Sequence, residues 1–108
     1  MIARIVLVLA ALSVFAARAQ TFEVPPELWD RPRTARAVLD QENVRRAVTA
    51  ALARPETQIV IHHSAGQEPL VQAEELRSWL AALAIDSRRT VLRGDAAPGA
   101  SITLEITP

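Results

Sequence analysis

The chain of 108 residues contains no cysteine, so no disulfide can stabilise it and no lipid can be attached through a cysteine. It contains no lysine either: its twelve basic residues are all arginine, and twelve Asp and Glu balance them. No basic segment stands out, which excludes an electrostatic surface for nucleic acid. A domain this small, without disulfides, must be held by its hydrophobic core or by a partner.

The one long hydrophobic run lies near the N-terminus. Residues Ile5 to Ala17 are apolar except for Ser13, a short basic start precedes them, and Ala17-Arg18-Ala19 follows. This pattern predicts a signal peptide over residues 1–19, cleaved before Gln20. The run is too short to span a membrane, which takes roughly 20 residues. We therefore expect a periplasmic mature chain with no membrane span.

Residues 20–36 are expected to form an extended N-terminal arm with at most an edge strand. Pro25 and Pro26 have no N–H to donate, so they cannot lie within a central strand. Trp29 has two interpretations that the sequence leaves open. It either covers the hydrophobic core or serves as an exposed anchor for a partner protein.

Two helices and three strands are expected in a domain spanning residues 37–108. Apolar residues recur at helical spacing in Asp40–Arg54, where Asp40 is the predicted N-cap, and from Pro69 to about Ala84. Between them, Thr57–His63 is typical of a central strand. Strands are also expected around Val91 and over Ser101–Thr107, paired as a hairpin.

This order, (β)-α-β-α-β-β, predicts an α+β fold: a two-layer sandwich in which two helices cover one face of a small mixed sheet.

In the order and spacing of its expected elements, the stretch from about Arg36 to Ile106 resembles the OmpA-like, peptidoglycan-associated domain family. Ile61-His62-His63-Ser64 stands where that family has its Gly-His-Thr-Asp turn, and Leu76-x-x-Trp79-Leu80-x-x-Leu83-x-Ile85 is similar to its second helix. The resemblance implies an α+β fold and a site for the peptide stem of peptidoglycan. The family holds diaminopimelate with an Asp and an Arg, whereas Ser64 and Gln72, at the matching positions, are uncharged.

The candidate ligand site lies at the start of the second helix, whose free N–H groups favour an anion. His63, Ser64, Gln72 and Arg77 are its expected lining, although Glu68 in the same turn opposes an anion. His62 and His63 point to opposite faces of a strand, and no third ligand lies at a recognisable spacing, so we expect no metal and no cofactor.

Ser64 lacks the surroundings of a nucleophile, because no G-x-S-x-G elbow encloses it. We therefore expect a non-enzymatic binding or assembly module of the cell envelope, with a degenerate OmpA-like fold and an envelope protein as partner. The alternative is a peptidoglycan-binding domain that uses an altered site. Hydrolytic activity that depends on His63 would contradict both.

Overall fold

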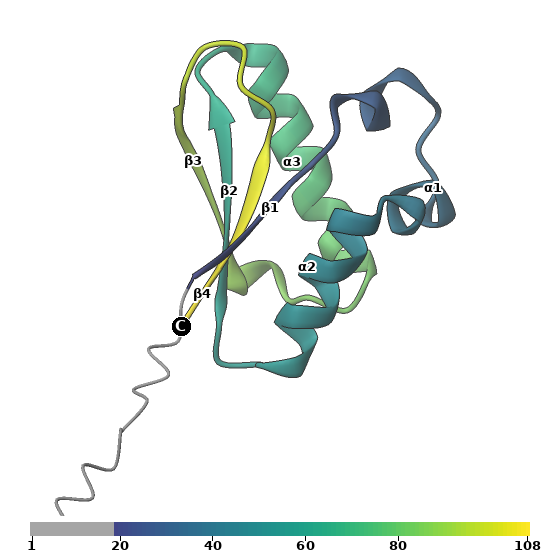
Figure 1. The fold of residues 1–108 in the computed structure, drawn as a ribbon, viewed down its shortest axis with the longest axis vertical. Helices are drawn as coiled ribbons and strands as arrows, with labels where there is room; N and C mark the ends of the chain where they lie inside the picture. The colour runs from purple at the N-terminus through teal and green to yellow at the C-terminus, as the bar shows by residue number, and fades with distance from the viewer. Residues whose placement is uncertain (1–18) are drawn as a thin grey trace, which may run out of the picture.

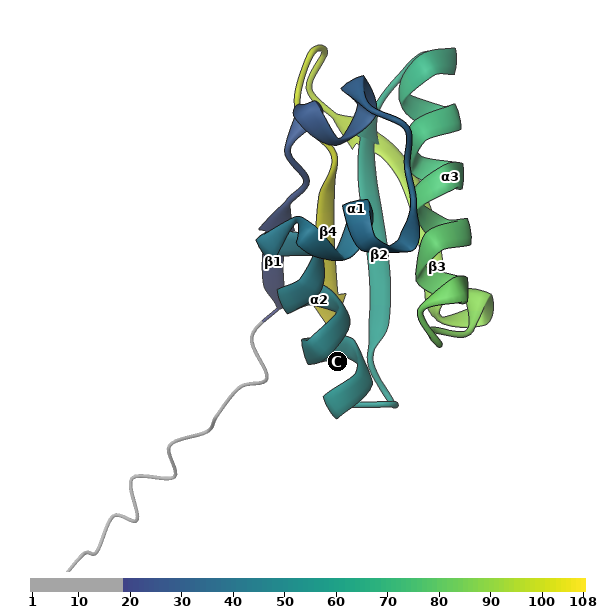
Figure 2. The ribbon, with the colours of Figure 1, turned by 90° about the vertical axis from the view of Figure 1, so that its right-hand side faces the viewer.

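The computed structural model describes residues 19–108, so the predicted signal peptide lies outside this part of the chain except for Ala19. The described residues form a mixed four-stranded sheet with helices packed on one face (Figures 1 and 2), which confirms the α+β class. In chain order the elements are β1 (Gln20–Glu23), the 3₁₀ turn η1 (Pro26–Asp30), α1 (Ala35–Asp40), α2 (Glu42–Ala53), β2 (Gln58–Ser64), α3 (Gln67–Ala82), the 3₁₀ turn η2 (Ser87–Arg89), β3 (Thr90–Ala96) and β4 (Thr103–Thr107).

The strands lie in the order β1-β4-β2-β3. Strand β2 is central, as predicted, and pairs in parallel with β3. Helix α3 forms most of the connection between these two strands. The predicted hairpin between the last two strands is wrong, because β4 pairs antiparallel with β1 and β2 and is not a neighbour of β3 in the sheet. Residues 97–102 are long enough to carry the chain past β2, a lateral step of two strand spacings, or about 10 Å.

The N-terminal segment departs from an extended arm after β1. Pro26 opens η1, and Thr34 caps α1 by accepting a hydrogen bond from the Ala37 N–H at 3.0 Å. The predicted N-cap at Asp40 is therefore wrong: Asp40 is the last residue of α1, and α2 starts after Gln41. The described chain has three α-helices where the sequence predicted two.

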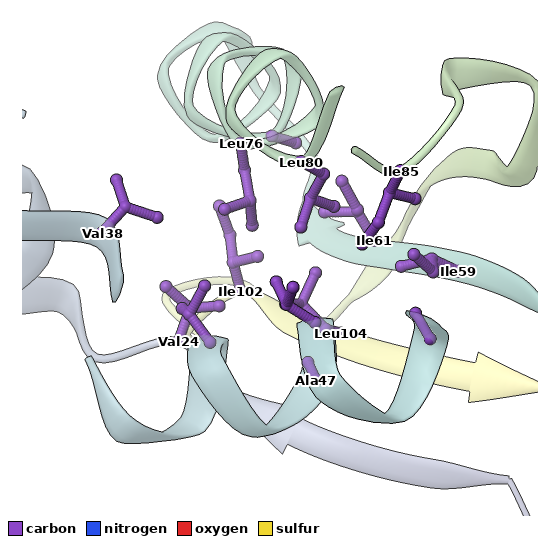
Figure 3. Packing of buried hydrophobic residues seen from close by; sticks show 14 of the residues in the cluster. Val24, Val38, Ala47, Ile59, Ile61, Leu76, Leu80, Ile85, Ile102 and Leu104 are labelled. Carbon is purple, nitrogen blue, oxygen red and sulfur yellow. The ribbon is translucent and has the colours of Figure 1, made fainter. Parts of the chain in front are cut away.

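The hydrophobic core lies between the sheet and the helices (Figure 3). Ile59 and Ile61 reach into it from β2, and Leu76 and Leu80 meet them from α3. Small residues on α2 let that helix lie close to the sheet. Three residues outside the predicted 37–108 domain or at its edge are also buried, namely Val24, Leu28 and Val38. The arm thus belongs to the same folded unit.

One arginine fastens the end of α2 to the start of β3. The Arg89 guanidinium donates to the carbonyl oxygens of Ala51 (2.8 Å), Arg54 (3.0 Å) and Thr57 (2.9 Å). A helix C-terminus leaves its last carbonyls without intrahelical partners, and a cation there also matches the helix dipole. This contact holds the turn between α2 and β2.

Candidate functional site

Aromatic, acidic, amide and apolar residues together line a groove beside the N-terminal end of α3, which we call the arm groove. It has a volume of about 360 Å³. Three segments far apart in the sequence form its walls: the η1 region, the first turns of α3 and the loop between β3 and β4. Its lining residues are Val24, Pro26, Trp29, Asp30, Glu68, Pro69, Gln72, Gly99, Ala100, Ser101 and Ile102.

The η1 wall is held against α3 by a cluster of polar and aromatic side chains. Arg33 forms an ion pair with Glu75 on α3 and lies 5.3 Å from the centre of the Trp29 ring. The Trp79 indole N–H donates to the same carboxylate at 3.2 Å. The hydrogen bond from Arg33, together with that from Trp79, lowers the pKa of Glu75. Trp29 therefore has a fixed place between the core and the groove.

Ser64, the last residue of β2, holds the β3–β4 loop that forms another wall of the groove. Its hydroxyl donates to the Ala97 carbonyl at 2.6 Å, and the Ala100 N–H donates to the same carbonyl at 3.0 Å. Gly99 adopts a φ of +76°, a backbone conformation that favours glycine. The loop is thus a defined turn anchored on the end of β2.

The electrostatics of the groove differ from those expected of an anion site. Asp30 and Glu68 line it, and no arginine is among its lining residues. Glu68 already places a negative charge in the first turn of α3, where the helix dipole favours one. A second anion would be repelled, whereas a cation or an amine would be attracted. Trp29 offers an apolar surface and Gln72 an amide that can both donate and accept.

The structure does not bring the four predicted ligand residues together. Gln72 lines the arm groove, but His63 and Ser64 are buried, 6% and 4% exposed, and are not among its lining residues. His63 Nδ1 lies 2.8 Å from the Ser64 carbonyl oxygen. Arg77 lies nearly three turns from the start of α3, and its guanidinium donates to the Ser87 carbonyl. Trp29 is partly buried against the core and also lines the groove.

A second polar cluster lies on the opposite face of the sheet, which no described helix covers. His62 Nδ1 is 2.6 Å from Asp95 of β3, and its Nε2 is 2.8 Å from Glu105 of β4. Hydrogen bonds to Asp95 and then Glu105 raise the pKa of His62. Sequence reasoning missed this cluster because its members come from three strands, and strand pairing alone brings them together.

Strand β3 carries an extra residue at this point. His62 pairs with Arg93 and Ser64 with Ala96, so two residues of β3, Gly94 and Asp95, stand opposite His63. The His63 ring packs over Gly94, where a Cβ would come within 3.2 Å of its Cε1 atom. The Arg93-Gly94-Asp95 tripeptide is therefore part of a strand, and its glycine makes room for a buried imidazole.

Residues 19–108 hold no cluster for a metal ion and no helix that could span a membrane. Nowhere in this range do three His, Asp or Glu side chains gather as a metal ion would require. The helices described there are also too short or too polar to cross a membrane.

No protein-family model, no curated protein and no solved structure matches the chain, so the OmpA-like resemblance stays a prediction.

Proposed function

We propose that the chain is an exported, non-enzymatic binding module of the cell envelope and that the arm groove is its ligand site. The observation that carries the proposal is the lining of this groove. An indole, Trp29, lies beside two carboxylates, Asp30 and Glu68, and an amide, Gln72, without any cationic side chain. Such a set suits a ligand in which a positive or amine-bearing group stands next to an apolar surface.

The side chains that resemble catalytic groups support a binding role because each is already engaged. The Ser64 hydroxyl donates to a backbone carbonyl, and the buried His63 makes its Nδ1 contact with the Ser64 carbonyl. His62 has a carboxylate at each ring nitrogen, on the face of the sheet opposite the helices. None of these places a free base beside an available nucleophile.

The signal-peptide pattern of residues 1–19 is the basis for assigning the module to the periplasm. An envelope protein is the partner expected for a binding or assembly module there. A partner segment with an exposed Lys or Arg beside an apolar side chain would fit the arm groove. Trp29 would contact the apolar part, and the two carboxylates would contact the cation.

Peptidoglycan is the second candidate ligand, favoured by the position of Gln72. The OmpA-like resemblance assigns Gln72 to a position that holds the peptide stem, and Gln72 lines the arm groove. The stem carries free amines, which two carboxylates would attract. Binding would then use a different charge pattern from the Asp and Arg of the family.

Co-sedimentation of the chain from Gln20 onward with purified sacculi tests the peptidoglycan candidate. We expect Glu68→Gln and Asp30→Asn to weaken any such binding and Glu74→Gln to leave it unchanged, because Glu74 lies exposed on the same helix but outside the groove. Failure of the native chain to sediment would reject peptidoglycan as the ligand.

The protein-partner candidate is tested by placing a photo-crosslinking residue at Gln72 in cells. A specific envelope protein that crosslinks there, and is lost in the Asp30→Asn/Glu68→Gln variant, would support the proposal. Crosslinking that is insensitive to both carboxylates would contradict the assignment of the arm groove as the site.

A further inference from the structure

The outer edge of β1 has backbone groups that no described residue pairs. The Val24 N–H donates to the Ile102 carbonyl at 2.8 Å, so Val24 and, by strand alternation, Phe22 and Gln20 direct their backbone groups toward β4. Thr21 and Glu23 must then direct theirs outward. Asn43 of α2 covers one of these groups, because its side-chain amide donates to the Glu23 carbonyl at 2.9 Å. The N–H and C=O of Thr21 and the N–H of Glu23 stay available.

A hollow of about 460 Å³ runs along this edge, between β1 and α2. We call it the edge groove. Phe22 from β1 and Ala50 and Ala53 from α2 supply its apolar residues. Its full lining is Gln20, Phe22, Arg45, Arg46, Thr49, Ala50 and Ala53. Figure 2 shows that β1 lies at the edge of the sheet and that α2 lies next to it.

The rim of the edge groove is positively charged. Arg45 and Arg46 are both exposed, and Arg54 lines an adjoining hollow that shares Gln20, Ala50 and Ala53 with it. Arg46 pairs with Glu42 at 2.9 Å, but both side chains are more than 60% exposed. Such a pair contributes little and can exchange for another carboxylate.

We propose that this edge binds an extended, acidic segment of a partner protein by strand addition. The segment would bond to Thr21 and Glu23 through its main chain and place apolar side chains on Phe22 and Ala50. Its carboxylates would meet Arg45 and Arg46. Main-chain bonds supply affinity in this mode of recognition, and alternate side chains supply specificity. This surface is separate from the arm groove, and either site can fail without the other.

The charges of the edge argue against two other occupants. A second copy paired edge to edge would bring the arginines of α2 toward their own equivalents, and like charges disfavour such an interface. Residues 1–18 of the same chain carry two arginines and no carboxylate, so they do not complement the rim. An acidic partner is the occupant that the charge pattern favours.

The test uses the chain from Gln20 onward, which holds every residue of the described core. The probe is a fluorescent ten-residue peptide in which Glu alternates with Val, and the control peptide has Lys in place of Glu. We expect the acidic peptide to bind and the Lys peptide not to bind. Binding should change the NMR chemical shifts of the protein, most strongly at the backbone amides of Thr21 and Glu23. Added salt should weaken the binding, because the charges are exposed.

Three variants separate strand addition from simple charge attraction. Arg45→Glu/Arg46→Glu should weaken the acidic peptide at least about tenfold, while Arg36→Glu, on the exposed side of α1, should not. Thr21→Pro should abolish the shift changes at β1, since it removes an outward N–H but no bond to β4. Equal binding of both peptides, unchanged binding in Arg45→Glu/Arg46→Glu or in Thr21→Pro, or a salt-sensitive dimer of the free chain would overturn the proposal.

Discussion

Ala84 has a left-handed backbone conformation, with a φ of +75°, just after the end of α3. The Ile85 N–H bonds to the Leu80 carbonyl at 2.9 Å and the Ala84 N–H to the Ala81 carbonyl at 3.1 Å, which is the Schellman pattern. This pattern usually has glycine at the position of Ala84, because a Cβ is strained there. The burial of Ile85 and Leu80 keeps the turn in place despite this strain.

We therefore expect Ala84→Gly to raise the free energy of unfolding by about 0.5–1 kcal/mol, measured by urea denaturation. The matched control is Ala81→Gly, an exposed position inside the last turn of the same helix. There glycine should lower the free energy of unfolding by about 1 kcal/mol. Destabilisation by both changes would show that the left-handed turn is not strained at Ala84.

Two buried threonines differ in the partners of their hydroxyl groups. The Thr90 hydroxyl has no hydrogen-bond partner among the described residues. The Thr57 hydroxyl donates to the Arg54 carbonyl at 2.7 Å and accepts from Arg89 at 3.0 Å. An unpaired buried hydroxyl costs free energy, whereas removal of a paired one leaves its partners unsatisfied.

We expect Thr90→Val to leave the unfolding free energy unchanged or to raise it by up to about 1 kcal/mol. Thr57→Val should lower it by about 1–2 kcal/mol, because two bonds are lost. Both values can be measured by thermal and urea unfolding of the two variants beside the native chain. Equal loss of stability in both would mean that the Thr90 hydroxyl does have a partner in solution.

At the scale of elements, His62 joins three strands, because it lies on β2 and contacts carboxylates on β3 and β4. Its bonds to Asp95 and Glu105 raise its pKa above the ordinary value of 6.5, and its bond to Asp95 lowers the pKa of that carboxyl below 3.8. Arg93, the register partner of His62, is the cation beside this cluster on β3. The cluster therefore stabilises the sheet most while both His62 and Asp95 are charged.

The sign of the pH dependence follows from these directions. The contribution of His62 is complete below pH 6.5 and is lost as the pH rises through its higher pKa in the folded state. The contribution of Asp95 is complete above pH 3.8 and is lost as the pH falls through its lowered pKa. We expect unfolding temperatures to be highest between these values and to fall on the alkaline side.

The alkaline decline should disappear in His62→Gln, which keeps a polar side chain but cannot titrate. The acid decline should persist in this variant, because the pKa of Glu75 is also lowered, in its pair with Arg33. Thermal unfolding measured from about pH 2 to about pH 9 checks both statements, because the acid decline lies below the ordinary pKa of Asp95. An unaltered alkaline decline in His62→Gln would assign it to another group.

The elements of the fold could largely be predicted from the sequence, but their pairing could not. Helical spacing located α2 and α3, and the alternation of Ile102, Leu104 and Ile106 with polar residues located β4. That alternation shows which face of a strand is buried and says nothing about which strand lies beside it. The predicted hairpin failed for this reason. α1 was missed because it is short and its cap, Thr34, lies in a Pro- and Arg-rich segment.

At the scale of the whole molecule, the ion pair between Arg33 and Glu75 joins the arm to α3. Glu75→Gln removes the charge that holds Arg33, so residues 26–33 should exchange their amide hydrogens several-fold faster. Any ligand binding in the arm groove should weaken in parallel, although Glu75 does not line the groove. Hydrogen exchange with mass spectrometry measures the first effect, and sacculus binding or crosslinking at Gln72 measures the second.

Glu74→Gln is the control for this prediction, because Glu74 is the exposed neighbour on α3 and its side chain takes no part in the arm contact. It should leave both measurements unchanged. Faster exchange in both variants would mean that losing any negative charge on α3 has this effect, and that the pair with Arg33 is not its cause. Unchanged exchange in Glu75→Gln would show that burial of Leu28 and Trp29 is enough to hold the arm.

The candidate site was harder to predict than the fold. Gln72 was expected to line the ligand site, and it lines the arm groove, but Asp30 and the β3–β4 loop were not expected there. Their meeting depends on the path of the arm and on the crossing of residues 97–102 over β2. Neither follows from local patterns. Arg77 was misplaced although helix geometry already excludes it: at 1.5 Å per residue it lies about 15 Å from Gln67 along α3.

The position of β4 determines the order in which the sheet can be completed. Synthesis produces β1 first and β4 last among the described strands, yet β4 lies between β1 and β2. Until β4 has been synthesised, β1 has no strand to pair with, and the antiparallel half of the sheet cannot form. The complete sheet can therefore form only after nearly the whole chain has been synthesised.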